Sequence, residues 1–410
     1  MKTKLIVSAA LIALICGYFI LYYRNKDLKF IPENADIVIL IDMKKAARQY
    51  ISNVLSHPSK WTSDNNENPN TVSLAESGVK IPDFLQIFHI GNTSLSDWYC
   101  ILELKDKQKL LTYLKSEKFT ESNNVFHKDH VFIRIVGQQC ILETSSQAFD
   151  NIKRLFPEFS HRTPFTSDLF INRSLGSISF ISNSKIHNFS IDVNADDIEI
   201  KTASNQDNFT SILSKVQQKT TFLNIELDAK NIKNLTSVFG KNFTDSVKID
   251  YVKATAELQA VHDTVITYGY DNDFNEIEKK TIQKIIQPNY FIALQSSHPE
   301  QTEQYFQERK WVNAQNQFTV IPFQPNVIEK KTGGFEIKSK GKPVRFPPVL
   351  NENYIFIKNN PSLFPQLKLL SVKEKRMVSA VDYIFYGNKD HEYYIKLKFK
   401  ENNLPLLLRW

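Results

Sequence analysis

Glycine is scarce in this chain, with 11 residues among 410. Proteins that bind phosphate groups in glycine-rich loops need several glycines close together, because only glycine lets the backbone approach the phosphate. The sequence contains no G-x-G-x-x-G fingerprint, no P-loop and no G-x-S-x-G elbow. These absences argue against common nucleotide-binding folds and against α/β-hydrolases.

Cysteine is also rare, since only Cys16, Cys100 and Cys140 occur and no C-x-x-C spacing is present. This excludes a zinc ribbon and a thioredoxin-like redox site. Cys100 and Cys140 each precede Ile-Leu-Glu in segments that we expect to be strands. They are either buried free thiols or, in an oxidising compartment, a disulfide between neighbouring strands. The sequence favours the free thiols and leaves the disulfide open.

No set of residues forms a recognisable catalytic site. The nine histidines are scattered, without H-x-x-x-H or H-E-x-x-H spacing. Three short patterns follow the order seen in penicillin-recognising serine enzymes, namely Ser77–Lys80 (S-x-x-K), Ser122–Asn124 (S-x-N) and Lys331–Gly333 (K-T-G). Gly78 and Pro82 interrupt the helix that such a serine and lysine require. We therefore predict no enzyme, no cofactor, and no catalytic, cofactor-binding or metal-binding residue.

Asp271–Asn275 resembles the start of a calcium-binding loop, but Glu276 replaces the expected glycine and Ile282 the expected final glutamate. We interpret Asp273 instead as the N-cap of a helix that carries Ile277, Ile282, Ile285 and Ile286. A hairpin is expected just before it, over about residues 247–270, with its turn near His262 and Asp263.

Residues 5–23 contain no charge and are rich in Leu, Ile, Val and Ala. As a helix this stretch is about 28 Å long, close to the hydrocarbon thickness of a bilayer. Tyrosines 18, 22 and 23 and then Arg24 close it, as is typical of a membrane interface. We predict a basic tail over residues 1–4, an uncleaved transmembrane helix over 5–23 and a juxtamembrane linker over 24–35, with the remainder outside the cytoplasm, in the periplasm. A cleaved signal peptide and a lipoprotein signal at Cys16 are less favoured alternatives.

The composition indicates folded domains, since 42% of residues are hydrophobic and 12% aromatic. The net charge of +7 is mild for 410 residues, and we predict no nucleic-acid partner. The densest basic run comprises Lys330, Lys331, Lys338, Lys340, Lys342 and Arg345. It fits either anionic lipid headgroups or the exposed edge of a hairpin, and we favour the hairpin edge.

Matched segments at nearly constant offsets favour an internal duplication. Apolar segments 36–41 and 222–227 precede Asp42 and Asp228, and each Asp is expected to cap the helix that follows. Five pairs are 192 residues apart: Tyr113 and Tyr305, Lys118 and Lys310, Phe119 and Trp311, Asn124 and Asn316, and Phe126 and Phe318. Further matches are Tyr99–Leu102 with Tyr290–Ala293, Ile141-Leu142 with Ile355-Phe356, and His187–Val193 with His391–Leu397.

We therefore predict an α+β fold, in which the transmembrane helix precedes two related units, 36–205 and 206–410. Each unit is expected to be a mostly antiparallel sheet with helices on one face.

The predicted function is a membrane-anchored binding or assembly module of the cell envelope that is not an enzyme. Its expected partners are the lipid bilayer, through residues 5–23, and an unidentified protein. One alternative is a carrier or sensor that holds an apolar or lipidic ligand between the two units. The other alternative is an enzyme of unrecognised type.

Overall fold

A computed structural model describes Tyr18 and residues 21–58, 76–145, 152, 165–182, 185–202, 207–238, 248–270, 272–321, 326–339, 344, 352–362 and 372–409. The chain divides into two compact units. Unit 1 comprises Met1–Ala203 together with Asn402–Trp410, and unit 2 comprises Ser204–Glu401.

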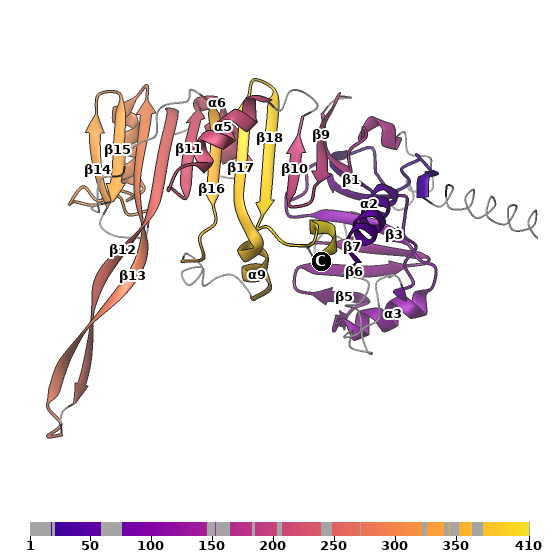
Figure 1. Cartoon of the computed structure of the whole chain (residues 1–410), viewed down its shortest axis with the longest axis horizontal. Helices are drawn as coiled ribbons and strands as arrows, with labels where there is room; N and C mark the ends of the chain where they lie inside the picture. Colours follow the sequence, from indigo (N-terminus) through magenta and orange to yellow (C-terminus); the bar gives the residue numbers. More distant parts are fainter. Residues whose placement is uncertain are drawn as a thin grey trace, which may run out of the picture. The chain divides into compact units, whose positions relative to one another are not determined.

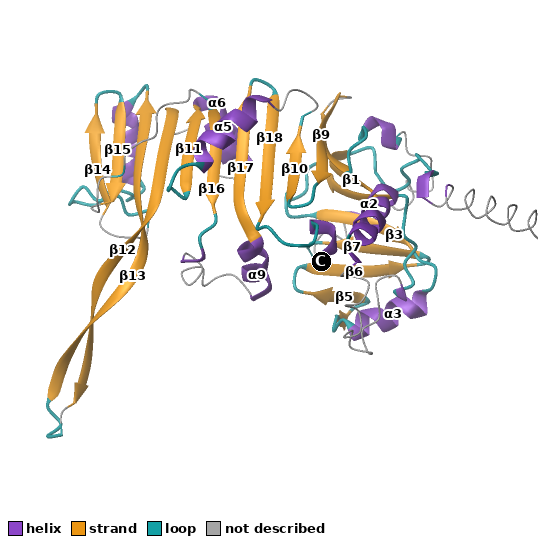
Figure 2. Cartoon of the chain, in the orientation of Figure 1, coloured by secondary structure: helices purple, strands orange, loops and turns teal. Residues whose placement is uncertain are grey.

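Unit 1 is built mainly of strands, which Figures 1 and 2 show. They are β1 (Ala35–Asp42), β2 (Phe84–Ile90), β3 (Trp98–Glu103), β4 (Thr120–Ser122), β5 (Val125–Lys128), β6 (Val131–Val136), β7 (Gln139–Glu143), β8 (Gly176–Ser182), β9 (Lys185–Val193) and β10 (Asp197–Lys201). The helices are α2 (Met43–Ser56) and α3 (Lys107–Ser116), with 3-10 turns η5 (Ser167–Leu169) and η7 (Leu406–Leu408).

Unit 2 has the strands β11 (Leu223–Asp228), β12 (Ile249–Tyr270), β13 (Glu276–Ser296), β14 (Asn326–Lys331), β15 (Gly334–Ser339), β16 (Asn353–Lys358), β17 (Val381–Lys389) and β18 (Glu392–Phe399). Its helices are α5 (Asp207–Gln217), α6 (Ala229–Val238), α8 (Pro299–Glu308) and α9 (Val372–Ala380).

The two units have the same strand order. In unit 1 the order is β6-β7-β3-β2-β1-β8-β9-β10, and every neighbouring pair is antiparallel. In unit 2 it is β14-β15-β13-β12-β11-β16-β17-β18, again antiparallel throughout. Along the chain, a helix follows β1 and the equivalent β11 (α2 and α6), and another follows β3 and the equivalent β13 (α3 and α8).

Elements that hold the same place in the two units are called equivalent. Three of the sequence matches fall on equivalent elements, namely β1 with β11, β3 with β13, and the end of α3 with the end of α8. In each of the other two matches, the segment of unit 2 lies one strand later along the chain than the strand equivalent to its partner in unit 1. Residues 141–142 lie on β7, whose equivalent is β15, whereas residues 355–356 lie on β16. Residues 187–193 lie on β9, whose equivalent is β17, whereas 391–397 lie at the turn into β18 and along it.

The α+β fold class predicted from the sequence is wrong, because antiparallel strands dominate the described residues of both units. The helices of unit 2 also do not share one face of its sheet. Phe356 and Ile355 are neighbours on β16, so their side chains point to opposite faces. Phe356 packs in a cluster with α5 residues Phe209 and Ile212, while Ile355 packs in another with Ile232 of α6 and Tyr305 of α8.

The hairpin of unit 2 is much longer than predicted. Strands β12 and β13 pair from Ile249 with Ser296 to Tyr270 with Glu276, so the turn lies after Tyr270 and not near His262. The helix predicted from Asn275 onward does not form, and Asp273 caps no helix, because Glu276–Ser296 is a strand. Figure 1 shows the hairpin extending well beyond the other strands of unit 2.

The predicted transmembrane helix is not supported. Within the described part of the chain, no helix is long and apolar enough to cross a membrane. Of residues 5–23, only Tyr18 and Leu21–Tyr23 are among the described residues. Unit 1 contacts this end directly, since Arg48 of α2 donates to the Leu21 carbonyl oxygen and Lys44 to that of Tyr23.

The segment predicted as a linker, residues 24–35, contributes to the core of unit 1. Leu28 and Ile31 are fully buried and Phe30 nearly so. They pack with Val38, Leu40, Phe84, Phe88, Tyr99, Ile101, Ile141 and Phe170. This core holds β1 and β2 in place, and with them the start of α2.

Candidate functional site

The end of β1 and the start of α2 carry a buried carboxylate. Asp42 is 1% exposed, and its side chain accepts a hydrogen bond of 2.8 Å from the backbone N–H of Lys45. It is therefore the N-cap of α2, and the capping role predicted from the sequence is confirmed. Asp228 caps α6 in the same way, through a 2.8 Å bond from the backbone N–H of Asn231.

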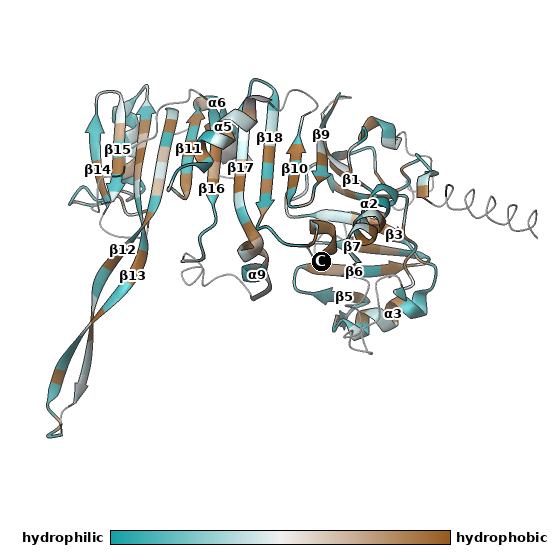
Figure 3. Cartoon of the chain, in the orientation of Figure 1, coloured by the Kyte–Doolittle hydropathy of each residue, from teal (hydrophilic) through white to brown (hydrophobic). Residues whose placement is uncertain are grey.

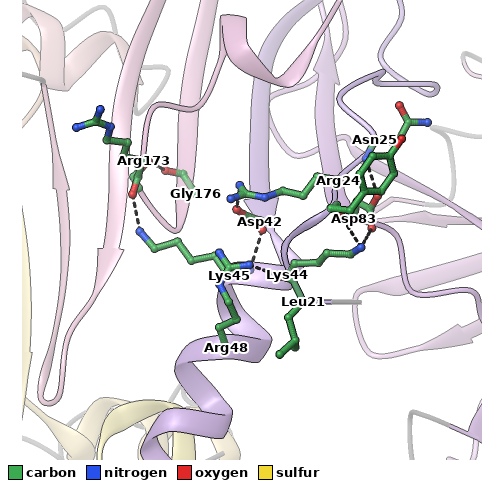
Figure 4. Close-up of polar contacts among 12 residues, drawn as sticks. Leu21, Arg24, Asn25, Asp42, Lys44, Lys45, Arg48, Asp83, Arg173 and Gly176 are labelled. Carbon is green, nitrogen blue, oxygen red and sulfur yellow. Dashed lines mark hydrogen bonds and ion pairs between the residues drawn. The ribbon is translucent and has the colours of Figure 1, made fainter. Parts of the chain in front are cut away.

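Cationic side chains gather around Asp42, as Figure 4 shows. The guanidinium of Arg24 forms an ion pair with the Asp42 carboxylate. Beside them the Lys44 ammonium lies 3.2 Å from Asp83, whose other carboxylate oxygen accepts a 2.7 Å hydrogen bond from the backbone N–H of Asn25. These pairs hold the chain before β1 against the start of α2.

Two further cations donate to backbone carbonyl groups instead of carboxylates. The Lys45 ammonium donates to the carbonyl oxygen of Arg173, and the Arg48 guanidinium to that of Leu21. Neither forms an ion pair with a carboxylate of the described residues. A carbonyl oxygen carries only a partial charge, so most of the positive charge of Lys45 and Arg48 remains available to an anion.

Arg24, Asp42, Lys45 and Arg48 line a cavity of about 750 Å³ in unit 1. Its lining comprises Tyr18, Tyr22, Tyr23, Arg24, Lys26, Asp42, Lys45, Arg48, Phe84, Ser167, Asp168, Ile171, Asn172, Arg173 and Ser174. Five of these side chains are basic and two are acidic. We name this space the basic cavity.

The basic cavity also has an aromatic wall. The rings of Tyr18 and Tyr22 stack with their centroids 5.3 Å apart, and the guanidinium carbon of Arg48 lies 4.7 Å from the centre of the Tyr22 ring. Cations next to aromatic rings suit a ligand with an anionic group and a flat or apolar part.

At the equivalent position in unit 2, Asp228 has no ion pair within the part of the chain that the structure describes. Asp228 accepts hydrogen bonds from two amides, those of Asn231 and of Asn353, at 2.9 and 2.8 Å. Burial opposes ionisation of Asp228. The hydrogen bonds from the Asn231 backbone and from the two amides, together with the nearby charge of Lys230, outweigh it and lower the pKa of the carboxyl below its ordinary value. Among the described residues, Asp228 therefore accepts hydrogen bonds from amides with Lys230 nearby, whereas Asp42 forms an ion pair with Arg24.

A buried ionisable pair lies elsewhere in unit 2. Glu226 and Lys253 are opposite each other on β11 and β12, with exposed fractions of 0% and 6%. Burial lowers the pKa of Lys253, and Glu226 partly offsets this. The equivalent pair in unit 1, judged by the strand registers, is Leu40 and Gln86. Because both members are enclosed, we assign this pair a structural role in the sheet.

The short motifs considered in the sequence do not form a catalytic site. Ser77 is buried, Gly78 has a φ of +79°, and Lys80 pairs with Glu103 at 2.6 Å, so residues 77–80 form no helix. Ser122 ends β4 in unit 1, whereas Lys331 ends β14 in unit 2.

The β14–β15 hairpin predicted for the basic run is confirmed, and Lys338 lies 2.6 Å from Glu329. Asp271, Lys340, Lys342 and Arg345 lie outside the described residues.

The described cysteines are free thiols on neighbouring strands, with Cys100 on β3 and Cys140 on β7. Burial raises the pKa of each thiol to about 12. A higher pKa lowers the fraction of reactive thiolate at neutral and mildly alkaline pH.

We expect the thiols of Cys100 and Cys140 to resist alkylation. A pKa near 12 instead of 9.0 lowers the thiolate fraction at pH 8 about a thousandfold. In a Cys16→Ser variant, iodoacetamide should label neither thiol of the native protein within hours, and both within minutes in guanidinium chloride. Mass spectrometry measures the labelling, which should accelerate as the pH rises. Rapid labelling of the native protein at pH 8 would contradict the burial of these thiols.

The cations of the basic cavity were not predicted from the sequence. Lys45 and Arg48 follow Asp42 at a spacing that places both cations in the first turns of one helix, and this spacing is the local signal that the sequence offers. Arg24 and Arg173 are distant in the sequence and meet them only in the fold.

Comparisons of the chain with protein-family models, with curated proteins and with solved structures find no match. The functional argument therefore depends on the geometry of the chain.

Proposed function

We propose that this chain is a non-enzymatic binding module whose basic cavity holds the anionic group of a ligand. The observation that carries the proposal is the imbalance of five basic against two acidic side chains around one cavity of unit 1. The ligand class is an organic phosphate or carboxylate with an apolar or aromatic part, which would contact the rings of Tyr18 and Tyr22.

The arrangement of partners supports binding more than catalysis. The Asp42 carboxylate caps helix α2 and forms an ion pair with Arg24, and the Asp168 carboxylate lies 2.7 Å from the Lys26 ammonium. The other basic side chains of the cavity, Lys45, Arg48 and Arg173, carry hydrogen-bond donors and no acceptors, which suits recognition of an anion. That the protein is extracytoplasmic stays a prediction.

The test uses inorganic pyrophosphate as the probe in isothermal titration calorimetry with the full chain. The variants Lys45→Gln and Arg173→Gln each remove one cation from the cavity, and each should weaken binding roughly tenfold or more, because a charge-assisted hydrogen bond contributes about 1.5–3 kcal/mol. Raising the salt concentration should weaken binding by the unaltered chain.

The matched control is Lys107→Gln, which removes an exposed lysine of α3 outside the cavity. It should leave the pyrophosphate affinity within about twofold of the unaltered chain. The proposal fails if pyrophosphate does not bind at millimolar concentration, or if all three variants bind it equally well.

A further inference from the structure

Within the described residues, the outer part of the long hairpin has no other strand beside it. In unit 2, Leu223–Asp228 of β11 pair with Tyr251–Ala256 of β12, and β15 pairs with Phe291–Gln295 of β13. Beyond these residues, the described part of the unit adds no third strand. We name residues 260–270 of β12 and 276–286 of β13 the arm, which Figure 1 shows as a two-stranded twisted ribbon.

The arm exposes large apolar side chains. Tyr268 and Ile282 are 68% and 70% exposed, and Phe274, in the turn that joins the two strands of the arm, is 86% exposed. Figure 3 shows apolar bands alternating with polar ones along the ribbon. A two-stranded ribbon is marginally stable in water, and an open strand edge invites pairing with another chain. The arm therefore has the character of an interaction surface.

The outer edge of β13 is complementary to itself. When two copies of this edge pair antiparallel about a twofold axis at Thr281, residues whose numbers add to 562 lie opposite each other. Glu278 then faces Lys284 twice, once on each side of the axis, and Ile277 faces Ile285 twice. Lys280 faces Ile282 and Lys279 faces Gln283, so no two like charges are opposite.

Neighbouring registers are worse in electrostatic terms. A register shift must be even, because an odd shift places opposed side chains on different faces of the sheet. When the numbers add to 560, Lys280 faces Lys280, and when they add to 564, Lys280 faces Lys284 twice. Like charges directly opposite are destabilising, so the register centred on Thr281 is favoured over both.

Charge on the monomer agrees with this arrangement. Among the residues that the structure describes, Glu278 forms one ion pair, with Lys280 of its own strand at 3.4 Å, and both side chains are largely exposed. Lys284 forms no ion pair within the described residues. A second copy would give Lys284 a carboxylate and continue the sheet from two strands to four.

From these observations we infer that two copies of this chain associate through the β13 edges of their arms, antiparallel and centred on Thr281. The partner is a second copy of this chain, because its β13 edge places a lysine opposite Glu278, a glutamate opposite Lys284 and an isoleucine opposite Ile277. This inference is independent of the basic cavity.

The experiment is sedimentation equilibrium of the full chain and of charge variants of the arm. The unaltered chain should be a dimer, and Glu278→Lys and Lys284→Glu should each raise the dimer dissociation constant at least tenfold, because each places two pairs of like charges opposite. An equimolar mixture of the two variants should dimerise again, since every Lys then faces a Glu. The double variant in one chain should also dimerise. Restored association also shows that the variants are folded.

The matched control is Asp263→Lys, an equally exposed acidic position on β12, the other strand of the arm. It should leave the dimer intact. A Thr281→Cys variant should form an inter-chain disulfide on mild oxidation, because the two residues face each other at the axis. A monomer at all concentrations, loss of the dimer in Asp263→Lys, or no rescue in the mixture would each overturn the inference.

Discussion

Replacement of Phe356 by alanine is expected to lower the free energy of unfolding of unit 2 by about 3–5 kcal/mol. Phe356 is fully buried on β16, between β11 and β17. Its ring lies 5.5 Å from that of Tyr383, centre to centre. The cluster around it joins Phe209, Ile212, Leu213 and Val216 of α5 to Tyr354, Tyr383, Phe385 and Tyr394 of the sheet.

The loss is large because the ring has contacts on every side. Removing it takes apolar surface out of contact and leaves a cavity that helix α5 and the sheet can only partly fill. Gly387 limits the relaxation, because a Cβ at that position would lie 2.5 Å from the Phe209 ring, so α5 already packs close to β17. The sheet and α5 therefore cannot simply move together.

Guanidinium chloride unfolding measures this change, followed by the fluorescence of Trp311 of unit 2 in a background where the other three tryptophans are replaced by phenylalanine. The matched control is Ile357→Ala, which alters the next residue of β16, on the opposite face and 41% exposed. Its expected cost is about 1 kcal/mol or less. Equal losses in Phe356→Ala and Ile357→Ala would contradict the placement of the core. Since the chain has two units, separate transitions for Trp311 and for Trp98 of unit 1 are expected.

The parts of the fold that could be predicted from the sequence are those with a local signal. The apolar segments that end at Asp42 and Asp228 are strands followed by capped helices. Both features could be predicted because an apolar strand and an N-cap each depend on residues that are adjacent in the sequence. The helix-end matches, such as Tyr113 with Tyr305, were found because aromatic residues at a constant offset are uncommon. These signals need no knowledge of distant contacts.

The long hairpin shows where local signals fail. Ile277, Ile282, Ile285 and Ile286 suggested one apolar face of a helix. In the strand they divide between two faces, Ile282 and Ile286 on one and Ile277 and Ile285 on the other. Glu276–Ser296 is a strand because it pairs with β12 along its whole length. This pairing depends on residues in another part of the sequence, so the segment by itself does not show it.

The basic cavity was missed for the same reason. Its cations come from residues 24, 26, 45, 48 and 173, and only the pairing of β1 with β8 brings the last of these near the others. A charge count along the chain cannot show such a cluster, because the mild net charge of +7 is spread over 410 residues.

Replacement of Asp42 by alanine is expected to destabilise unit 1 by about 3 kcal/mol, through the loss of the α2 cap and of the buried partner of Arg24. Asp42→Asn retains an oxygen for the backbone N–H of Lys45, so it should cost about half as much. Asp228→Ala in unit 2 is the matched comparison. It removes the same cap and two amide hydrogen bonds but no ion pair of the described residues, and should cost about 1–2 kcal/mol.

Urea unfolding separates these costs when it is followed by fluorescence in two single-tryptophan backgrounds, one that keeps Trp98 for unit 1 and one that keeps Trp311 for unit 2. Asp42→Asn has a second expected effect, because it removes one of the two acidic groups that line the basic cavity. The affinity for pyrophosphate should therefore rise about threefold or more, while Asp228→Ala leaves it unchanged. A variant that is less stable yet binds the anion more tightly separates the structural role of Asp42 from its charge. If Asp42→Asn instead weakened binding as Arg173→Gln does, the carboxylate would hold the cations in place for the ligand, and its negative charge would not oppose binding.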